Sequence, residues 1–443
     1  MKAKTFKGGI HPHDCKHYSN KAAVEDFPAP EKVIIHLSQH IGAPALPIVK
    51  KNDVVKKGQK IAEAGGFVSI PMHSPISGKV IQIAKFPHPT GTIQQAIEIE
   101  NDGKDEWFSK LKDEENYFNL SVDEMKNRIK NAGICGMGGA GFPTHVKLSP
   151  PENKPIDMII LNGVECEPYL TSDHRLMLER PEEIIAGLKL IMKIVSAKRG
   201  FIGIELNKKD AINLMKEKLK NEKNLNVVPL KLRYPQGAEK QLIYAATKRK
   251  VPAGGLPMDI GAVVQNVGTA FAIYESIRFQ KPLINRITTV TGDIVKTPKN
   301  LRVPIGSSMS EMLDFCGGTN EEIGKLISGG PMMGFALPQI DTPISKTSSG
   351  IVFLSKKDVD TVHEQPCLRC GRCVDACPMN LVPTFLAETV RNGMYEEAKK
   401  MNINDCIECG SCSFVCPSHI QIVQWIKVGK LEVGKLAKKA NEK

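Results

Sequence analysis

The chain has 443 residues, of which 41% are hydrophobic and 24% charged, and 60 Lys and Arg against 48 Asp and Glu give a formal net charge of +12. The composition is that of soluble globular protein, and the length predicts about three domains. No run approaches the ~18 apolar residues of a membrane span, and the basic N-terminus lacks the apolar region of a secretory signal, so we expect an intracellular protein. With 5% aromatic residues and no stacking motif, the positive charge indicates a solvated surface rather than a nucleic-acid site.

Short β-like runs broken by turns follow the N-terminus and predict a barrel or sandwich module over residues 1–115. The turns at 56–59 and 74–80 resemble those of biotinyl and lipoyl carrier modules. The hairpin between them, residues 65–69, has no lysine to which a carrier group attaches. We therefore expect a structural module without a swinging arm.

A charged connector leads to alternating strand-like and helix-like runs over residues 121–280. Ser121 and Glu124 have the spacing of a capping box at the start of a helix. The runs that read as strands are 156–161, 201–206 and 227–232. Their alternation with helical runs predicts an α/β domain with a largely parallel sheet. Strand and short helix signals return over 283–355 and predict a second small module.

Eight of the twelve cysteines lie in two runs near the C-terminus, each with the pattern C-x2-C-x2-C-x3-C-P. This is the pattern of bacterial ferredoxins with two clusters, in which the fourth cysteine of each run binds the other cluster. The spacing predicts one [4Fe–4S] cluster on Cys367, Cys370, Cys373 and Cys416. It predicts a second on Cys406, Cys409, Cys412 and Cys377.

Two zinc sites are the alternative, since C-x2-C pairs also bind zinc, but such sites need two pairs per ion rather than four cysteines and a proline twice over. Helix-like runs at 382–390 and 394–401 separate the two cysteine runs, and they predict a helical ferredoxin-like domain over 360–425. The Lys-rich residues 426–443 are expected to form a solvated basic tail. The four isolated cysteines, at 15, 135, 166 and 316, are expected to hold no cluster.

A glycine loop and a group of polar side chains precede these runs. Residues 136–141 have the pattern G-x-G-x-x-G, but a helix stands where a dinucleotide fingerprint has a strand, so a structural turn is the alternative to a phosphate loop. Asn162, Glu165 and Glu167 follow the first predicted strand of the α/β domain, where ligands bind in open sheets. Two such carboxylates suit acid–base work or hydrogen bonds to ribose or flavin groups; a solvated loop is the alternative.

Residues 136–144 and 162–168 closely resemble the flavin and nicotinamide site of the NADH-binding flavoprotein of respiratory complex I. With segments 8–12 and 38–44 and the cysteine runs, nearly the whole chain resembles the RnfC family, the C subunits of the Rnf complex, which is an ion-translocating ferredoxin:NAD oxidoreductase. The resemblance implies a β-grasp-like (SLBB-type) module over 283–355. The implied fold class is multidomain α/β plus small β modules.

The resemblance also implies the cofactor contacts. The residues implied for FMN are Gly136, Gly138, Gly139, Lys147, Asn162, Glu165, Asn266 and Thr269. The residues implied for NAD(H) are Phe142, Glu167 and Glu239, with Phe142 stacking on the nucleotide and Glu167 as the catalytic residue. The sequence departs from the complex I pattern at Met137, Val164 and Ala238, where an arginine, an aspartate and a glutamate are usual.

We therefore expect FMN and two [4Fe–4S] clusters as cofactors, with hydride exchange between NAD(H) and FMN and single-electron exchange between FMN and the clusters. The expected place is the cytoplasmic side of the cell membrane, as a peripheral subunit without a transmembrane segment. The expected partners are the other subunits of an Rnf-type complex, especially its ferredoxin-like iron–sulfur subunit, with ferredoxin as an indirect partner and no nucleic acid.

Two other functions share some of these features. The equivalent subunit of the sodium-pumping NADH:quinone reductase shares the modules but lacks the cysteine domain, so the eight clustered cysteines exclude it. An iron–sulfur electron-transfer adaptor without a working nucleotide site is the remaining alternative. Flavin in the purified protein separates this adaptor from the enzyme.

Overall fold

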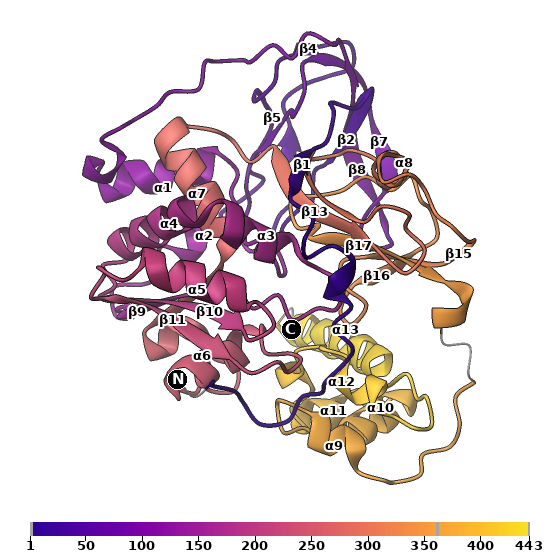
Figure 1. Ribbon diagram of the computed structural model, residues 1–443. Coiled ribbons are helices and arrows are strands. Elements are labelled where there is room, and N and C mark those ends of the chain that lie inside the picture. Colours follow the sequence, from indigo (N-terminus) through magenta and orange to yellow (C-terminus); the bar gives the residue numbers. More distant parts are fainter. Residues whose placement is uncertain (1–2, 360–362, 442–443) are drawn as a thin grey trace.

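The computed structural model describes residues 3–359 and 363–441. A β-rich module, an α/β domain, a second β module and a helical C-terminal domain occupy separate parts of the molecule (Figure 1). This layout is the multidomain α/β class with small β modules that the sequence predicts. Within the described ranges, no helix has the length and apolar character needed to cross a membrane.

Two small antiparallel sheets build the N-terminal module, in the strand orders β2-β8-β7-β4 and β3-β5-β6. Alternate residues of the long strands, such as Val33, Ile35, Ile97 and Ile99, are buried between the sheets, as the period of a half-buried strand requires. The strands are β2 (Lys32–His36), β3 (Leu46–Pro47), β4 (Val54–Val55), β5 (Lys60–Glu63), β6 (Met72–His73), β7 (Gly78–Pro87) and β8 (Ile93–Asn101).

A four-stranded, all-parallel sheet in the order β11-β10-β9-β12 forms the α/β domain, as expected. The strands are β9 (Met158–Asn162), β10 (Arg199–Glu205), β11 (Leu225–Leu230) and β12 (Ala262–Asn266). The helices are α1 (Val122–Asn131), α2 (Thr144–Lys147), α3 (Ser172–Glu179), α4 (Pro181–Ile194), α5 (Lys209–Lys218), α6 (Glu239–Thr247) and α7 (Val267–Phe279). The Ser121 hydroxyl caps α1 by accepting from the N–H of Glu124, whereas the Glu124 carboxylate pairs with Arg128 instead of closing the box.

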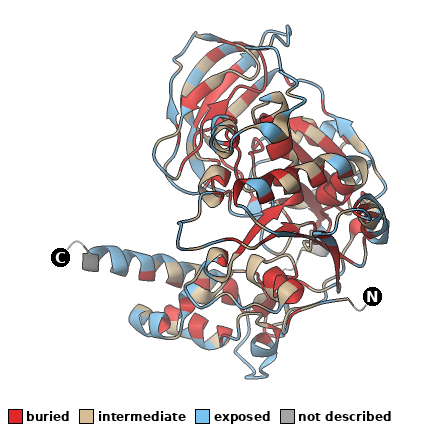
Figure 2. Cartoon of the chain, turned by 90° about the vertical axis from the view of Figure 1, so that its left-hand side faces the viewer, coloured by how far each residue is buried: buried red, intermediate tan, exposed pale blue. Residues whose placement is uncertain are grey.

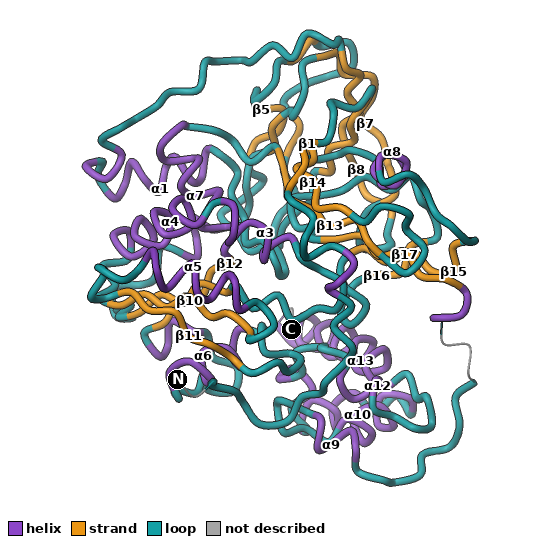
Figure 3. The backbone as a smooth tube through the Cα atoms, viewed as in Figure 1, coloured by secondary structure: helices purple, strands orange, loops and turns teal. Residues whose placement is uncertain are grey.

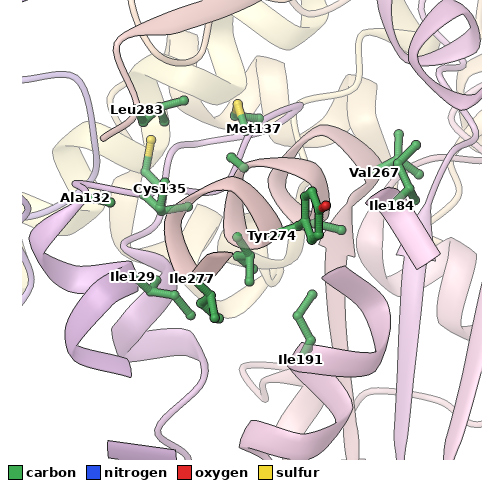
Figure 4. Close-up of a cluster of buried hydrophobic side chains, with 14 of the residues drawn as sticks. Ile129, Ala132, Cys135, Met137, Ile184, Ile191, Val267, Tyr274, Ile277 and Leu283 are labelled. Atoms are coloured by element: carbon green, nitrogen blue, oxygen red, sulfur yellow. The ribbon is translucent and has the colours of Figure 1, made fainter. Parts of the chain in front are cut away.

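Helix α7 lies at the centre of the largest hydrophobic core (Figure 4). Val267 and Ile277 pack there with Ile191 of α4, and Cys135 and Met137 of the glycine-rich segment join the same core. Burial of each large apolar side chain contributes about 1.5–3 kcal/mol. The base of the glycine loop is therefore fixed to α7 by packing.

The second β module is a mixed six-stranded sheet in the order β1-β14-β13-β17-β15-β16. Its strands are β13 (Asn285–Thr291), β14 (Lys299–Pro304), β15 (Ile323–Ser328), β16 (Phe335–Leu337) and β17 (Gly350–Ser355), with helix α8 (Met309–Phe315). Strand β1 (Val24–Asp26) pairs with β14 in parallel at the sheet's edge. Residues 24–26 thus belong to this sheet, although the sequence assigned them to the N-terminal module.

The α-helices of the C-terminal domain, within its described residues, are α9 (Arg372–Ala376), α10 (Pro383–Arg391), α11 (Tyr395–Lys400), α12 (Ser411–Phe414) and α13 (Ile422–Asn441). Helices α10 and α11 confirm the two helices expected between the cysteine runs. The expected boundary between 425 and 426 is wrong, because α13 runs through it and buries Ile426 and Val433. The basic tail is therefore the outer part of a helix that extends from the domain (Figure 2).

The irregular N-terminal segment runs between the α/β domain and the helical domain (Figure 3). Lys4 bridges to Leu230 and Ile10 to Tyr234, both in the α/β domain. The N–H of Gly9 donates to the carbonyl of Ala376 in the helical domain at 2.9 Å. This segment therefore ties the two domains together.

Candidate flavin and iron–sulfur sites

The two cysteine runs fold in the same way. Arg369 and Glu408, each one residue before the second cysteine, both have positive φ, and so do Gly371 and Gly410 directly after it. A glycine adopts this conformation at no steric cost, which turns the chain sharply and starts a short helix. Each run is therefore a loop followed by a helix that bears its third cysteine.

Cys377 lies with the second run rather than with its own. A small pocket is lined by Cys377, Cys406, Cys409 and Cys412 together with apolar side chains such as Leu381 and Ile426. This is the crossed set that the spacing predicts, and we call it the inner cluster site. The crossing follows from the fold, because helices α9 and α12 pack against each other.

The inner cluster site has the chemistry of an iron–sulfur site. Burial raises the pKa of Cys406 to about 11 and that of Cys412 to about 12, so thiolates form there when a metal offsets their charge. The N–H groups of Glu408 and Leu381 point at the sulfurs of Cys406 and Cys377 at 3.4 Å. No three metal-binding side chains among residues 3–359 and 363–441 are grouped closely enough for a single ion. A cubane binds each of four thiolates through a different iron, and the four cysteines of this site supply such a ligand set.

The second crossed set, Cys367, Cys370, Cys373 and Cys416, is called the outer cluster site. Cys367 and Cys370 are exposed, in contrast to Cys409 and Cys412, which are buried. Two hydrogen bonds join the segment before Cys367 to the segment after Cys416, namely Gln365 N–H to the carbonyl of Ser418 and the Ser418 hydroxyl to the carbonyl of Pro366. They hold the first and last cysteines of this set at the same end of the domain.

The glycine loop lies over the first turn of α7. The N–H of Met137 donates to the Thr269 hydroxyl at 2.9 Å, and Asn266 caps α7 by accepting from the N–H of Gly268 at 2.7 Å. Gly138 has φ +78°, and a Cβ there would lie 2.8 Å from the Asn266 amide nitrogen, whereas a Cβ on Gly139 would have no neighbour within 4 Å. The structure thus brings the predicted loop together with Asn266 and Thr269.

The loop after β9 supplies Asn162 and Glu165 to the same edge of the sheet. The Asn162 amide donates to the carbonyl of Gly237 at 2.8 Å. Glu165 has φ 47°, and its carboxylate accepts from the N–H of Asp173 at 2.7 Å at the start of α3. Its negative charge is favourable at a helix N-terminus. Glu165 is therefore positioned by α3.

Lys147 and Glu239, one expected at the flavin and the other at the nucleotide, form an ion pair of 2.7 Å between α2 and α6. Both are partly exposed, at 25% and 39% of their side-chain area, so solvent weakens the pair. Phe142 is partly exposed, and its carbonyl accepts from the N–H of Gly136. The structure thus joins α2 to α6 through this ion pair, and it joins Phe142 to the start of the glycine loop.

Glu167 has contacts other than those expected of a nucleotide-positioning residue. Its carboxylate accepts from the N–H groups of Met332 at 3.0 Å and Met333 at 2.9 Å, between β15 and β16. The Tyr234 hydroxyl lies 3.5 Å from it and donates to the carbonyl of Cys409 at 2.8 Å. Glu167 therefore joins the α/β domain to the six-stranded sheet beside the inner cluster site, and these contacts do not support its expected catalytic role.

Sequence reasoning missed a set of buried charged groups around the loop after β9. Lys16 donates to the carbonyl of Leu170, and Lys208 to that of Val164 at 2.7 Å. Asp173 accepts from the Asn266 amide at 2.6 Å, and burial raises the pKa of Asp173 to about 6. Arg286 is 3% exposed and reaches this region from β13. The sequence signal that could have revealed Arg286 was an arginine in a strand that is otherwise mainly apolar or hydroxyl-bearing.

Family comparisons cover the chain in four consecutive pieces. They are the RnfC barrel sandwich hybrid domain over residues 4–104, the Nuo51 FMN-binding domain over 129–275, the SLBB domain over 287–336 and the 4Fe-4S dicluster domain over 360–424. The glycine loop, Asn162, Glu165, Asn266 and Thr269 all lie inside the FMN-binding match. The expected β-grasp-like module is confirmed by the SLBB match.

Two curated relatives cover almost the full length. The C subunit of the proton-translocating ferredoxin:NAD(+) oxidoreductase complex of Clostridium ljungdahlii is 53% identical over 97% of this chain and 94% of the relative. The C subunit of the Na(+)-translocating complex of Acetobacterium woodii is 46% identical over 100% of both. Among solved structures, the NAD+-reducing [NiFe]-hydrogenase in the H2-reduced state shares the fold, with a TM-score of 0.50, 16% identity, and coverage of 69% of this chain and 61% of that one. The chain therefore belongs to the RnfC family, the C subunits of the ion-translocating ferredoxin:NAD oxidoreductase (Rnf) complexes, with FMN and two [4Fe–4S] clusters as its cofactors.

Proposed function

We propose that the chain exchanges electron pairs between NAD(H) and FMN and passes single electrons between FMN and its two clusters, within an ion-translocating ferredoxin:NAD oxidoreductase complex. FMN, when bound, supplies the conversion between two-electron and one-electron chemistry. The observation that carries the proposal is the direct contact between the FMN-binding domain and the inner cluster site. The Tyr234 hydroxyl donates to the carbonyl of the ligand Cys409 at 2.8 Å, and Gln241 donates to the carbonyl of Pro378, next to Cys377, at 3.1 Å.

This contact indicates the order in which electrons pass through the two clusters. The inner site faces the FMN-binding domain, and Gly8 packs so closely on Cys377 that a Cβ there would lie 2.8 Å from the Cys377 carbonyl oxygen. The outer site has two exposed cysteines. Electrons therefore pass between the flavin domain and the inner cluster, and leave or enter the protein at the outer cluster.

The FMN contacts remain those proposed from the resemblance, and their geometry supports them. The glycine loop and the N-terminus of α7 lie together, and backbone of this kind donates N–H groups to anions. Asn162 and Glu165 stand at the end of β9, beside Asn266 at the end of β12, where open parallel sheets bind ligands. Their side chains offer both donors and acceptors to a flavin.

The nicotinamide nucleotide is proposed to bind at the partly exposed Phe142 and Glu239, while Lys147 stays among the proposed FMN contacts. Phe142 provides a ring face for stacking. Lys147 and Glu239 pair with each other at 2.7 Å, so the pair joins the residue proposed for FMN to the residue proposed for the nucleotide. Glu167 is assigned a positioning role at the interface with the cluster domain.

The outer cluster site is proposed as the exchange point with the ferredoxin-like iron–sulfur subunit of the complex, on the cytoplasmic side of the membrane. Leu368, Arg369 and Arg372 surround Cys370 on an exposed loop, and Leu368 exposes 69% of its area. An apolar side chain beside two cations suits docking of an acidic electron carrier.

An anaerobic visible spectrum of the full chain, recorded before and after addition of NADH, tests the proposed function. We expect the flavin band and the broad cluster absorbance to bleach together. Phe142→Ala should slow this bleaching while FMN stays bound, and Phe315→Ala, a partly exposed phenylalanine of the six-stranded module, is the control. Protein that holds no flavin and does not respond to NADH would instead be the electron-transfer adaptor.

A further inference from the structure

Arg286 is a buried cation, two of whose nitrogen atoms, Nε and Nη2, have no hydrogen-bond partner within residues 3–359 and 363–441. It stands on β13, opposite Val303 of β14, and its side chain leaves the six-stranded sheet toward the FMN-binding domain. Only 3% of its area is exposed, and no group in the described chain accepts a hydrogen bond from Nε or Nη2. Burying unpaired guanidinium donors costs several kcal/mol, so such an arrangement normally has a ligand or a role.

The guanidinium lies at the first turn of α7. A Cβ on Gly268, the second residue of that helix, would lie 3.2 Å from Nη1 of Arg286 and 3.8 Å from Oδ1 of Asp173, a carboxylate oxygen that is also buried without a partner. The same turn is capped by Asn266 and covered by Met137 of the glycine loop. Arg286 is thus beneath the loop and beside the N-terminus of α7, and both the loop and this helix end lie inside the residues of the FMN-binding match.

The other cations around the loop are already engaged. Lys147 pairs with Glu239 at 2.7 Å, and Lys346, buried below the loop, donates to the carbonyls of Gly133 at 2.7 Å and Pro71 at 3.2 Å. The acidic neighbours of Arg286 are Glu165, which is bound to the start of α3, and Asp173. Arg286 therefore has donors free for a further anionic or acceptor group at this turn.

We propose that Arg286, contributed by the six-stranded module, binds the phosphate group of FMN together with the first turn of α7 and the glycine loop. This rests on the FMN site of the proposed function. A guanidinium donates two parallel hydrogen bonds to a phosphate, and a helix N-terminus adds N–H donors and a favourable dipole. The flavin site is then shared between two domains, and the six-stranded module sets the preference for FMN over riboflavin.

Titration of the flavin-free full chain, with its clusters intact, tests this assignment by flavin fluorescence. Wild-type protein should bind FMN more tightly than riboflavin. Arg286→Met should weaken FMN binding by about ten- to a hundredfold and riboflavin binding by less than about threefold, since riboflavin has no phosphate. Lys346→Met is the matched control: a buried cation of the same module whose loss should lower the melting temperature without changing the FMN-to-riboflavin ratio.

Equal weakening of both flavins by Arg286→Met, or an unchanged ratio, would overturn the assignment and make Arg286 structural. If that variant does not fold, Arg286→Lys gives the same test, because an ammonium keeps the charge but loses the paired geometry, and FMN alone should weaken. Wild-type protein that binds FMN, with an unchanged ratio in the variant, contradicts the Arg286 assignment by itself. Wild-type protein that binds neither flavin contradicts the proposed function and this assignment with it.

Discussion

Substitution of Cys377 distinguishes crossed ligation of the clusters from ligation within one cysteine run. It lines the cavity of Cys406, Cys409 and Cys412, which are about 30 residues further along the chain. Cys377→Ala should therefore lower the iron content from about eight to about four per chain and remove the inner cluster. Its electron paramagnetic resonance spectrum should match that of Cys409→Ala.

Cys316→Ala is the control for this prediction, because Cys316 is buried in the six-stranded module and should leave both clusters intact. A Cys377→Ala spectrum that matches Cys370→Ala would show that each run binds its own cluster.

The buried carboxyl group of Glu205 should make the stability of the protein depend on pH. It is 1% exposed at the end of β10, and burial raises its pKa to about 7 even though Lys208 lies 3.9 Å away. Because the folded pKa exceeds the unfolded value of about 4.3, the folded state holds more protons between these values, and stability falls as pH rises from about 4.5 to 7. Glu205→Gln should remove this loss and stabilise the protein at pH 8 by about 1–3 kcal/mol, with no gain at pH 5.

The measurement is the anaerobic melting temperature at the two pH values, with Glu217→Gln as a control on the adjacent helix α5. A lower melting temperature for Glu205→Gln at pH 8 would mean that the pair with Lys208 outweighs the cost of burying the charge.

At the scale of elements, the glycine loop and α7 act as one unit. Substitutions at Gly138 and Gly139 test separately how this unit contributes to stability and to FMN binding. Gly138→Ala places a methyl group 2.8 Å from the Asn266 amide at a φ of +78°, which costs about 1 kcal/mol or more. We expect it to lower both the melting temperature and the affinity for FMN. Gly139→Ala meets no protein atom within 4 Å, so it should weaken FMN binding at unchanged stability.

Differential scanning fluorimetry of the flavin-free protein and FMN titration check the two effects. If Gly139→Ala binds FMN as the wild type does, the loop does not approach the cofactor at that residue.

The elements that the sequence predicted are those whose signals are local. The spacing of Cys406, Cys409 and Cys412 and the capping residue Ser121 lie within a few residues of what they organise, so their roles were readable from the chain. The partners of Glu167 are about 165 residues away in a turn of another module, and β1 joins a sheet about 275 residues further on. No local pattern encodes such pairings, which is why the positions of Glu167, Arg286 and β1 came only from the fold.

At the scale of the whole molecule, the flavin domain and the cluster domain must keep a fixed relative position for electrons to pass between them. Hydrogen bonds on the described chain that do this include those between Gly9 and Ala376, Gln241 and Pro378, Tyr234 and Cys409, and Gly254 and Asp405. Tyr234 is 2% exposed and is the connection nearest a cluster ligand. We therefore expect a change at Tyr234 to affect electron transfer between the two domains more than it affects either cofactor by itself.

Tyr234→Phe removes one hydroxyl and leaves the Cys409 carbonyl without its donor, at a cost of about 0.5–1.5 kcal/mol. We expect NADH to reduce the flavin at the wild-type rate and the clusters to be reduced about three- to tenfold more slowly, with about eight irons retained. Stopped-flow spectroscopy at flavin and cluster wavelengths separates the two steps. Tyr244→Phe, a partly buried tyrosine of α6 that lies against Lys248, makes the same chemical change away from the interface and should alter neither step. Slowing of flavin reduction in Tyr234→Phe would place this tyrosine at the nucleotide site instead. Unchanged cluster reduction would show that the packing of Gly8 on Cys377 is sufficient to hold the two domains in position.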